Sequence, residues 1–398
     1  MRPHFLRLAA LAQQPSRRII GLMSGTSLDG LDVALCRFTG AGRGVDVTVE
    51  AFETIPYEAA FKAKIKAVFA KQSIDFQQLV LLNVEVAEHH AAIVNDCLRR
   101  WGIAAAEVDL LASHGQTVFH APRHFHHLPD APNATLQIGD GDHLARRTGL
   151  ITVSDFRQKH LAAGGEGAPL ALYGDYFLFS KPGADRYLLN IGGIANFTFL
   201  PAEGDPSQAF ATDTGPGNTV LDQFAFLLFK VPFDRDALLA SAGIVDVGLL
   251  DRLKSDPFFD LPFPKSTGPE QFSADWVQAA LSQQPKGNPN PYNIMATLTQ
   301  LSADTVAAAL LQAQGNRGAA ALFVSGGGAH NPLMMKLLHE KLGAWRIAPM
   351  AALGIDGDAK EAVLFAALAN ETVAGEYSDQ ATLGGIPLTG MGKISLPD

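Results

Sequence analysis

The sequence predicts an α/β protein built from two similar lobes. Short apolar runs typical of strands alternate with longer segments of helical spacing along most of the 398 residues. Two segments, 18–38 and 186–200, share one pattern: an apolar run, a turn of glycine and small polar residues, and a second apolar run. The composition, 47% hydrophobic and 18% charged, supplies apolar material for more than one core. These observations indicate two strand–loop–strand units, one in each lobe.

The spacing of apolar residues along the chain predicts the remaining helices and strands. Helices are expected where apolar residues recur every three or four positions, over 58–69, 76–99, 219–229, 332–342 and 359–375. Strands are expected over 108–112, 150–156 and 320–324, and a strand, a turn and a helix over 135–149. The stretch 285–293, rich in proline and asparagine, is expected to be a loop.

We expect residues 18–150 with 370–398 to form the first lobe and residues 151–369 to form the second. Residues 1–17 have a short apolar core and no small-residue cleavage site, which disfavours a targeting segment. They are therefore expected to be a frayed N-terminal extension.

Charge and cysteine content exclude several kinds of partner and site. Lys and Arg number 31 against 40 Asp and Glu, a formal charge of −9, and no dense basic stripe occurs, so neither nucleic acid nor an anionic membrane is expected as a partner. No apolar run approaches the roughly 18 residues that span a bilayer. Cys36 and Cys97 lie in apolar segments, which argues against a disulfide framework or a cysteine zinc site. A cytoplasmic location is expected.

Glycine is the unusual residue of this chain, with 38 copies, many of them in particular loops. The loop SGTSLDG at 24–30 combines two glycines, which let backbone N–H groups approach an anion, with three hydroxyl donors. Asp29 and Asp32 add oxygens that could reach a hydrated magnesium ion. The pattern predicts phosphate binding, and the alternative is an ordinary Asp-Gly hairpin turn.

Two further glycine loops follow the same logic. Gly192 and Gly193 separate two predicted strands, where packing gives no reason for paired glycines and close approach of a ligand does. The alternative there is a β-bulge. The glycines of SGGGAHN, 325–331, join a strand to a helix and would let a planar ligand lie against the backbone. The spacing of these loops matches neither a dinucleotide fingerprint nor a P-loop.

Asp213, in DTGPGN, is the acid most suggestive of catalysis. A rigid turn follows it, and Asn218 is expected to cap the helix predicted over 219–229. An aspartate held there beside phosphate-binding loops could act as a general base. The alternative is that Asp213 is itself a turn or cap residue.

Three polar residues follow predicted strands and could face a substrate. Arg157 could clamp a carboxylate with two parallel hydrogen bonds, or form a surface or interlobe salt bridge instead. Glu166 lies in the glycine loop that comes next. His114 precedes a His-rich stretch whose spacing fits no zinc pattern, so metal ligation is not expected there.

Taken together, these motifs resemble the anhydro-N-acetylmuramic acid kinase family of bacterial peptidoglycan recycling. The motifs occur in one order between residues 20 and 331: IGLMSGTSLDGLDVAL, ASHGQTVFH, TLQIGDG, VSDFR, GGEGAPL, NIGGIANFTF, DTGPGN, PKSTG and SGGGAHN. The resemblance spans nearly the whole chain beyond the N-terminal extension. It implies the fold of hexokinase, actin and heat-shock ATPases, with two RNase-H-like lobes and ATP in the cleft between them.

The resemblance also implies an activity and assigns roles to residues. ATP, water and 1,6-anhydro-N-acetylmuramic acid would give the 6-phosphate sugar and ADP, with Asp213 matching the catalytic base, Glu361 matching an acid near magnesium, and His114 and Arg157 lining the sugar site. Glu166, in the sugar-side loop, stands where the family commonly has Gln. The positions matching the ATP-binding segments are Gly25, Thr26, Ser27, Leu28, Asp29, Gly30, Leu31, Asp32, Gly192, Gly193, Gly326, Gly327, Gly328 and Asn331.

Two alternatives stay open at the level of sequence. Glu166, and Pro269 where the family commonly has Arg, leave a levoglucosan-type anhydrosugar kinase as the nearest alternative. A non-kinase ATPase module on the same fold is the alternative from another class. The resemblance further implies that the enzyme is a homodimer.

Overall fold

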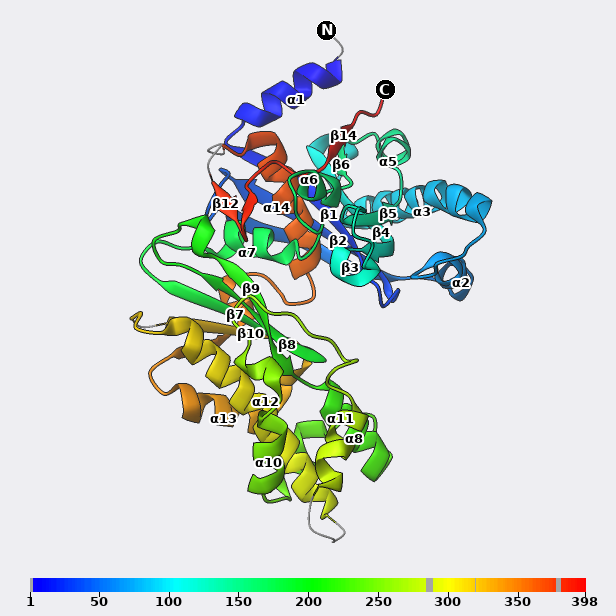
Figure 1. The fold of residues 1–398 in the computed structure, drawn as a ribbon. Helices are drawn as coiled ribbons and strands as arrows, with labels where there is room; N and C mark the ends of the chain where they lie inside the picture. The colour runs from blue at the N-terminus through cyan, green and yellow to red at the C-terminus, as the bar shows by residue number, and fades with distance from the viewer. Residues whose placement is uncertain (1–2, 284–288, 319, 377–380) are drawn as a thin grey trace. The chain divides into compact units, whose positions relative to one another are not determined.

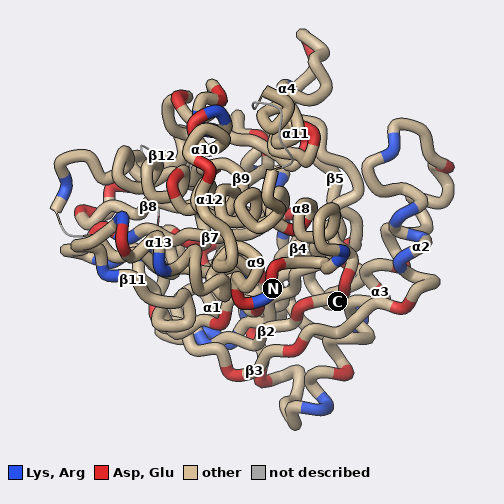
Figure 2. The backbone as a smooth tube through the Cα atoms, turned by 90° about the horizontal axis from the view of Figure 1, so that it is seen from below, with Lys and Arg blue, Asp and Glu red and all other residues tan. Residues whose placement is uncertain are grey.

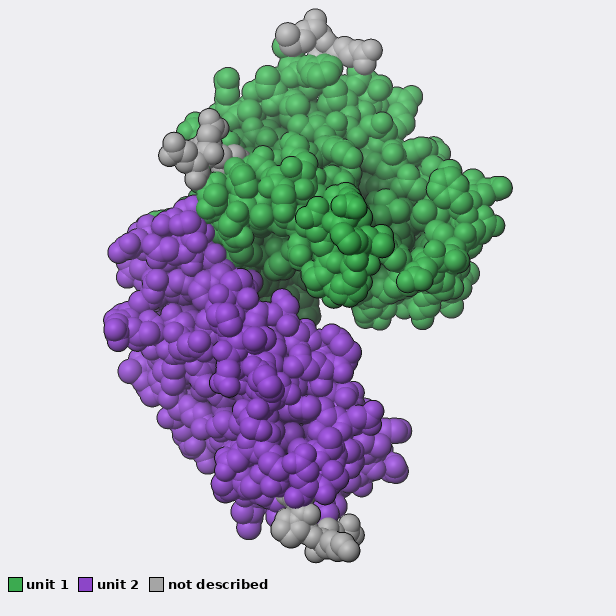
Figure 3. All heavy atoms as spheres, in the orientation of Figure 1, with its two compact units in different colours: residues 1–180, 354–398 green, residues 181–353 purple. Residues whose placement is uncertain are grey.

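The computed structural model describes residues 3–283, 289–318, 320–376 and 381–398. The chain forms two compact units: unit 1 holds residues 1–180 and 354–398, and unit 2 holds residues 181–353 (Figure 3). The two lobes were expected to divide at 150/151 and 369/370, and the units divide elsewhere. Residues 151–180 belong to unit 1 because strand β6 (Thr152–Ser154) pairs with β4 (Leu110–Ala121), and 354–369 belong there because α14 (Lys360–Ala374) packs on β1 (Ser16–Ser24).

Unit 1 is built on a seven-stranded mixed sheet with the order β14-β6-β4-β1-β2-β3, in which β5 also pairs with β4. Strands β1, β2 and β3 form an antiparallel meander. Strand β4 runs parallel to β1, and β6 runs parallel to β4. The hairpin expected over 18–38 is therefore confirmed. The other strands of the sheet are β2 (Gly30–Thr39), β3 (Asp46–Pro56), β5 (Ala134–Ile138) and β14 (Lys393–Ser395).

Helix α14 lies closer to β1 than ordinary side chains permit. A Cβ added to Gly21 would lie 1.9 Å from the carbonyl oxygen of Ala362, so only glycine fits at the centre of this strand. This contact places the first turn of α14 beside β1. The other helices of unit 1 are α2 (Ala59–Val68), α3 (Phe76–Trp101), α4 (Arg123–His126), α5 (Gly141–Thr148), α6 (Arg157–Ala162) and α7 (Ala171–Phe179), with a short β12–β13 ribbon (Thr382–Leu383, Ile386–Pro387).

The N-terminal segment is ordered against unit 1, so the expectation of a frayed extension is wrong for it. Residues Pro3–Gln13 form helix α1. Leu11 is buried, and the guanidinium of Arg7 donates to the carbonyl of Val108 at 2.8 Å. These contacts fix a segment whose own periodicity predicts little.

Unit 2 repeats the strand order of unit 1 in a five-stranded sheet, β11-β10-β7-β8-β9. Strands β7, β8 and β9 form an antiparallel meander. Strand β10 runs parallel to β7, and β11 runs parallel to β10. An antiparallel meander extended, beyond its first strand, by two parallel strands is the RNase-H-like arrangement, which is confirmed in both units. The strands are β7 (Asp185–Ile191), β8 (Ile194–Leu200), β9 (Phe210–Pro216), β10 (Ala320–Ser325) and β11 (Arg346–Pro349).

The core of unit 2 is completed by α12 (Pro291–Gln314), which packs on β8 and β9 with α13 (Pro332–Leu342) beside it (Figure 1). Within the described residues α12 is the one helix long and apolar enough to cross a membrane, but 83% of its apolar window is buried, as in a core helix. Its start at Pro291 shortens the loop expected over 285–293, of which 285–288 lie outside the described residues. The remaining helices are α8 (Thr219–Phe229), α9 (Leu238–Ser241), α10 (Val247–Lys254) and α11 (Ala274–Ser282).

Acidic and basic residues are interspersed along both units (Figure 2). Many of them pair at the surface, as where Arg18 and Arg37 both contact the carboxylate of Glu50 at 2.6 and 2.7 Å. Exposed pairs of this kind contribute little to stability.

Candidate active site

The β1–β2 hairpin of unit 1 ends in the turn 25–29, where phosphate binding is predicted. Thr26, Ser27 and Asp29 are exposed, whereas Leu28 is buried in the core although its φ is +60°. A non-glycine residue takes this left-handed conformation only where its surroundings impose it. Here the buried side chain and a 3.3 Å hydrogen bond from the Leu28 N–H to the Gly25 carbonyl hold it. The turn therefore presents two hydroxyl groups to solvent from a fixed base.

The two glycines of this loop differ in what surrounds them. A Cβ on Gly30 would lie 2.3 Å from the carbonyl oxygen of Ile55, so packing of β2 on β3 already requires glycine there. A Cβ on Gly25 would make only ordinary contacts, the nearest at 3.6 Å from the Ser27 hydroxyl. Gly25 is thus the glycine whose presence protein packing does not explain.

Two partly buried carboxylates of unit 1, Asp32 and Glu361, have a raised pKa. Asp32 follows Leu31, which is buried, and accepts a 2.6 Å hydrogen bond from the Thr54 hydroxyl. Burial raises the pKa of Asp32, and the charge of Asp358 adds to the shift. Burial also raises the pKa of Glu361, in the first turn of α14, and the charge of Asp32 adds to it. A cation near such carboxylates would favour their ionised forms.

The two carboxylates are of the kind that could bind magnesium together with the phosphates of a ligand. Among the described residues, no group of three or more His, Cys, Asp or Glu side chains is arranged to hold a metal ion. Mg²⁺, however, usually keeps several waters and binds through one or two carboxylates together with substrate phosphates. Asp32 and Glu361 supply such a pair. Asp358, whose charge acts on Asp32, was not identified as a site residue from the sequence. The acidic residues just before α14 are the pattern that could have indicated it.

Replacing Asp32 by Asn, or Glu361 by Gln, is expected to raise the Mg²⁺ concentration needed for half-maximal nucleotide binding about tenfold or more, the scale of loss typical of groups that support a metal site. Titration of Mg²⁺ at fixed nucleotide measures this. The matched control is Glu85→Gln, which removes one exposed carboxylate of unit 1 that pairs with Lys64. An equal response of Glu361→Gln and the control would contradict the assignment.

His114 and Arg157, both predicted to line the sugar site, lie in contact with each other. The Arg157 guanidinium donates to Nε2 of His114 from Nε at 3.1 Å and from Nη2 at 3.0 Å, and to the carbonyl of Gly167 at 2.7 Å. Burial and then the Arg157 charge lower the pKa of His114 to about 3, so the ring is neutral and Nε2 is an acceptor. Burial also lowers the pKa of Arg157, and the charge of Glu361 opposes this shift.

Glu166 is only loosely associated with this pair. Its carboxylate lies 3.1 Å from Nδ1 of His124, and both side chains are largely exposed. The connection to Arg157 runs through the backbone, because Gly167 is the next residue and accepts from the guanidinium. Glu166 therefore borders the Arg157 site from the His-rich segment rather than forming part of its hydrogen-bond network.

In unit 2, most of the predicted ligand-binding glycines are required by packing between loops. A Cβ on Gly193 would lie 2.5 Å from the Thr219 hydroxyl, and one on Gly328 would lie 2.2 Å from a side-chain carbon of Ile191. Gly326 has a φ of +81° and no room beside Ile191. The expectation that packing gives no reason for the paired glycines is wrong for Gly193, which lies against the Thr219 side chain, and Gly326 and Gly328 are likewise confined, by Ile191 at the end of β7. Gly192 and Gly327 have the most open surroundings, with the nearest atoms at 3.4 Å.

Two asparagines act differently from each other at the neighbouring helix starts. Asn331 caps α13, since its side chain accepts from the N–H of Met334 at 3.0 Å. Asn218, expected to cap α8, does not; its amide donates instead to the carbonyl of Ile191 at 3.1 Å. This difference arises because Asn218 has a helical backbone, with φ −90° and ψ −19°, rather than the extended one of a capping residue.

Asp213 lies within β9, and its half-buried carboxylate is held by a backbone group. The N–H of Thr267 donates to its Oδ2 at 2.8 Å, and the Asp213 N–H donates to the Lys265 carbonyl at 2.9 Å. Burial raises the pKa of Asp213, and the Thr267 hydrogen bond opposes the shift. Thr267 was not predicted as a site residue, although it belongs to the PKSTG motif. The arrangement gives an oriented carboxylate with proton affinity above that of an ordinary aspartate.

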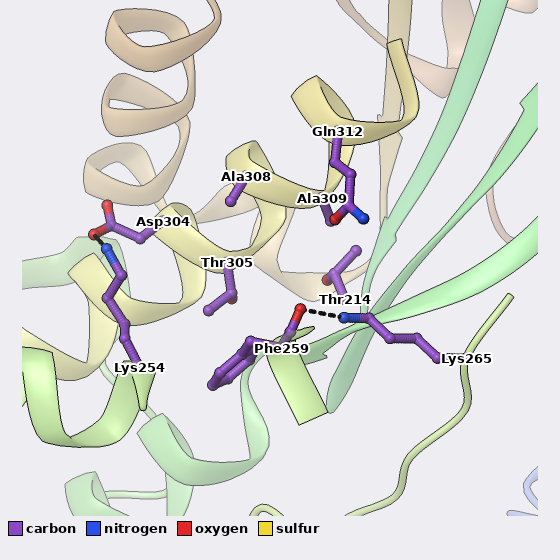
Figure 4. Close-up of a pocket in the computed structure, with 9 residues that line it drawn as sticks. All are labelled: Thr214, Lys254, Phe259, Lys265, Asp304, Thr305, Ala308, Ala309 and Gln312. Atoms are coloured by element: carbon purple, nitrogen blue, oxygen red, sulfur yellow. Dashed lines mark hydrogen bonds and ion pairs between the residues drawn. The ribbon is translucent and has the colours of Figure 1, made fainter. Parts of the chain in front are cut away.

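A pocket in unit 2 lies against α12 and does not include Asp213 (Figure 4). Thr214, the next residue along β9, is among the residues that line it. Buried Lys265 donates to the carbonyls of Phe258 and Phe259 at 2.9 and 2.8 Å. Its ammonium group therefore has a structural role at the edge of this pocket.

Comparison with known proteins decides the family. The family model described as anhydro-N-acetylmuramic acid kinase matches residues 17–385. The chain belongs to the anhydro-N-acetylmuramic acid kinase family. The resemblance drawn from the motifs is thereby confirmed, and with it membership of a kinase family.

Members of the anhydro-N-acetylmuramic acid kinase family match this chain end to end. The protein of that name from Pseudoalteromonas atlantica is 49% identical, with 100% of each chain covered. The one from Salinibacter ruber is 39% identical, with 98% of this chain and 99% of the relative covered. Among solved structures, hexokinase from Schistosoma mansoni is 12% identical, with 88% of this chain and 85% of that chain covered and a TM-score of 0.36.

Proposed function

We propose that this protein is an ATP-dependent kinase that opens 1,6-anhydro-N-acetylmuramic acid hydrolytically and phosphorylates its 6-oxygen, giving N-acetylmuramic acid 6-phosphate and ADP. The observation that carries the proposal is the oriented Asp213 carboxylate of raised pKa, in a chain of this kinase family. A general base is most effective when its pKa lies closer to the working pH.

Asp213 is proposed to accept a proton from water. The water oxygen forms a bond to the anomeric carbon while the bond from that carbon to the 6-oxygen breaks. The freed 6-oxygen forms a bond to the γ-phosphorus of ATP, and the bond from that phosphorus to the bridging oxygen of ADP breaks. The Thr267 N–H engages one lone pair of Oδ2 of Asp213, and we assign Oδ1 as the proton acceptor. A positioned base of this kind contributes about 10²–10⁴-fold to the rate.

The β1–β2 turn and the acids of unit 1 are proposed to hold the nucleotide phosphates. Thr26 and Ser27 offer exposed hydroxyl donors, and Gly25 admits close approach of an anion. Asp32 and Glu361 would hold Mg²⁺, which neutralises charge on the transferring phosphoryl group. The glycine loops of unit 2 that retain open surroundings, at Gly192 and Gly327, are proposed to approach the rest of the nucleotide.

Arg157 is proposed to bind the lactyl carboxylate of the muramic sugar. A guanidinium carries five N–H groups, and three of them are engaged with His114 and Gly167. One N–H on each terminal nitrogen therefore remains for a bidentate contact. Neutral His114 fixes the plane of the guanidinium without competing for its charge.

The same contact distinguishes the proposed substrate from levoglucosan, an anhydrosugar that has no carboxylate. Arg157→Lys loses the bidentate geometry, so its KM for 1,6-anhydro-N-acetylmuramic acid is expected to rise about 10-fold or more while its KM for levoglucosan stays unchanged. Steady-state ADP release with each sugar measures both. A wild-type preference for levoglucosan, or an equal effect of the substitution on both sugars, would reject the muramic acid assignment.

We further propose that the enzyme acts in the cytoplasm as a homodimer, which the family resemblance supports. Analytical ultracentrifugation of the full chain tests the oligomeric state, with a monomer at micromolar concentration as the contrary result.

A further inference from the structure

Four buried polar side chains of unit 1 form a continuous hydrogen-bonded chain behind the β1–β2 turn. Ser24, Tyr57, His90 and Gln116 are each at most 4% exposed. The Ser24 hydroxyl lies 2.7 Å from the Tyr57 hydroxyl and donates to Oε1 of Gln116 at 2.6 Å. The Tyr57 hydroxyl lies 2.8 Å from Nε2 of His90. The chain therefore runs from α3, which carries His90, to β1 and β4.

The protons in this chain can point in only one direction. The amide of Gln116 contacts the carbonyls of Thr117, at 3.1 Å, and Gly25, at 3.4 Å, so its nitrogen must face them and its oxygen must face Ser24. The one hydroxyl proton of Ser24 is then given to Gln116, and Ser24 must accept from Tyr57. Tyr57 in turn must accept from Nε2 of His90, which fixes the ring tautomer. Burial lowers the pKa of His90 to about 3, which keeps this ring neutral.

Such a chain is a poor way to stabilise a core. With Nε2 protonated, Nδ1 of His90 is an acceptor, and it has no hydrogen-bond partner among the described residues. An unpaired buried acceptor opposes folding, whereas apolar side chains of similar shape would pack without this penalty. The network therefore calls for a role beyond stability.

The residues of this network are hydrogen-bonded to both ends of the turn 25–29. At one end, the Gln116 amide donates to the carbonyl of Gly25, the first residue of the turn. At the other end of the turn, the backbone N–H of Tyr57 donates to the carbonyl of Asp29 at 3.2 Å. Tyr57 thus contacts both ends of residues 25–29, one through its side chain and Ser24, the other through its backbone. With the carbonyls of Gly25 and Asp29 bonded to the protein, the turn is held with the Thr26 and Ser27 side chains exposed, where their hydroxyl groups could contact an anion.

We propose that Tyr57, His90 and Gln116 are positioning residues that fix the β1–β2 turn for the phosphates of a nucleoside triphosphate. This inference rests on the proposed function, because it assigns the phosphates to that turn. None of the three side chains touches the nucleotide; they act through Ser24 and the backbone of Gly25 and Asp29.

Tyr57→Phe removes one hydroxyl and keeps the ring and the backbone bond to Asp29. It is expected to weaken binding of Mg²⁺ with the non-hydrolysable analogue ADPNP about 3- to 10-fold, on the scale of one net hydrogen bond, and to speed amide hydrogen exchange at residues 25–29. The matched control is Tyr173→Phe, which removes another buried hydroxyl of unit 1, bonded to the Leu383 carbonyl at 3.4 Å. The control is expected to leave both measurements unchanged.

A double-mutant cycle separates positioning from general damage. If Ser24 and Tyr57 act through one chain, the Ser24→Ala, Tyr57→Phe double variant binds ADPNP no more weakly than the worse single variant. Three results would each overturn the proposal: losses of affinity that multiply in the double variant, unchanged binding and exchange in both single variants, or equal losses in Tyr57→Phe and Tyr173→Phe. If Tyr57→Phe fails to fold, the comparison of Ser24→Ala with Tyr173→Phe decides. Sugar-dependent ADP release by the wild-type protein is measured in parallel, so that failure of the proposed function is seen separately from these binding results.

Discussion

Replacing Asp213 by Asn is expected to lower kcat for ADP release with 1,6-anhydro-N-acetylmuramic acid about 10²–10⁴-fold. The substitution keeps the shape of the side chain and an oxygen for the Thr267 N–H, but removes the group that accepts the proton of water. Affinity for the sugar and for ADPNP should change little, since neither depends on the base. Steady-state kinetics and equilibrium binding on the same preparation measure both quantities.

Stability supplies the control for this variant. Burial raises the pKa of Asp213, so its ionised form is disfavoured in the folded protein, and the cost applies above that pKa. Asn carries no such cost, and the variant should therefore unfold at pH 7 no more easily than the wild-type protein. For the wild-type enzyme, activity should fall as the pH decreases through the raised pKa, at a higher pH than an ordinary aspartate would give. Near-normal turnover by a folded Asp213→Asn variant is incompatible with the assigned base.

The largest expected effect on stability is that of Arg17→Ala, about 3–5 kcal/mol in the free energy of unfolding. Arg17 is 2% exposed, and its guanidinium donates to Oδ1 of Asn370 at 2.6 Å and to the carbonyl of Gly40 at 2.5 Å. Its charge also interacts with buried Glu371. Truncation would leave these acceptors and that carboxylate without the cation. Urea denaturation followed by circular dichroism measures the change.

The matched control for Arg17→Ala is Arg37→Ala in the neighbouring strand. Arg37 is half-exposed and pairs with Glu50 at 2.7 Å, so its loss is expected to cost at most about 1 kcal/mol. Similar losses in the two variants would show that the buried network around Arg17 contributes no more than a surface ion pair.

Local pattern predicted much of this fold. The two hairpins, the helix begun by Pro332 and the helix over 359–375 all appear where apolar spacing and turn residues place them. The division of the chain was not predictable in the same way. Residues 354–369 join unit 1 because Gly21 lets α14 approach β1, and a contact across more than 300 residues leaves no local periodicity.

The candidate site was likewise predictable from the sequence only where short local motifs indicate it. Asp213, Arg157 and His114 stand in short motifs whose residue types suggest chemistry. The sequence motif cannot show that Gly193 and Gly328 are required by neighbouring loops, because a glycine looks the same whether a ligand or a side chain lies beside it. Tyr57 and His90 lie in ordinary amphipathic surroundings, and only the folded chain brings them to the turn.

The central claim is that ATP is consumed to phosphorylate an anhydrosugar. The most direct test is ADP release by the full chain with and without 1,6-anhydro-N-acetylmuramic acid and Mg²⁺, with the position of the γ-phosphoryl group identified by mass spectrometry. We predict ADP release that requires both the sugar and Mg²⁺, with the phosphoryl group recovered as a sugar 6-phosphate. Release of ADP and free phosphate at the same rate without the sugar would contradict the account and indicate a non-kinase ATPase.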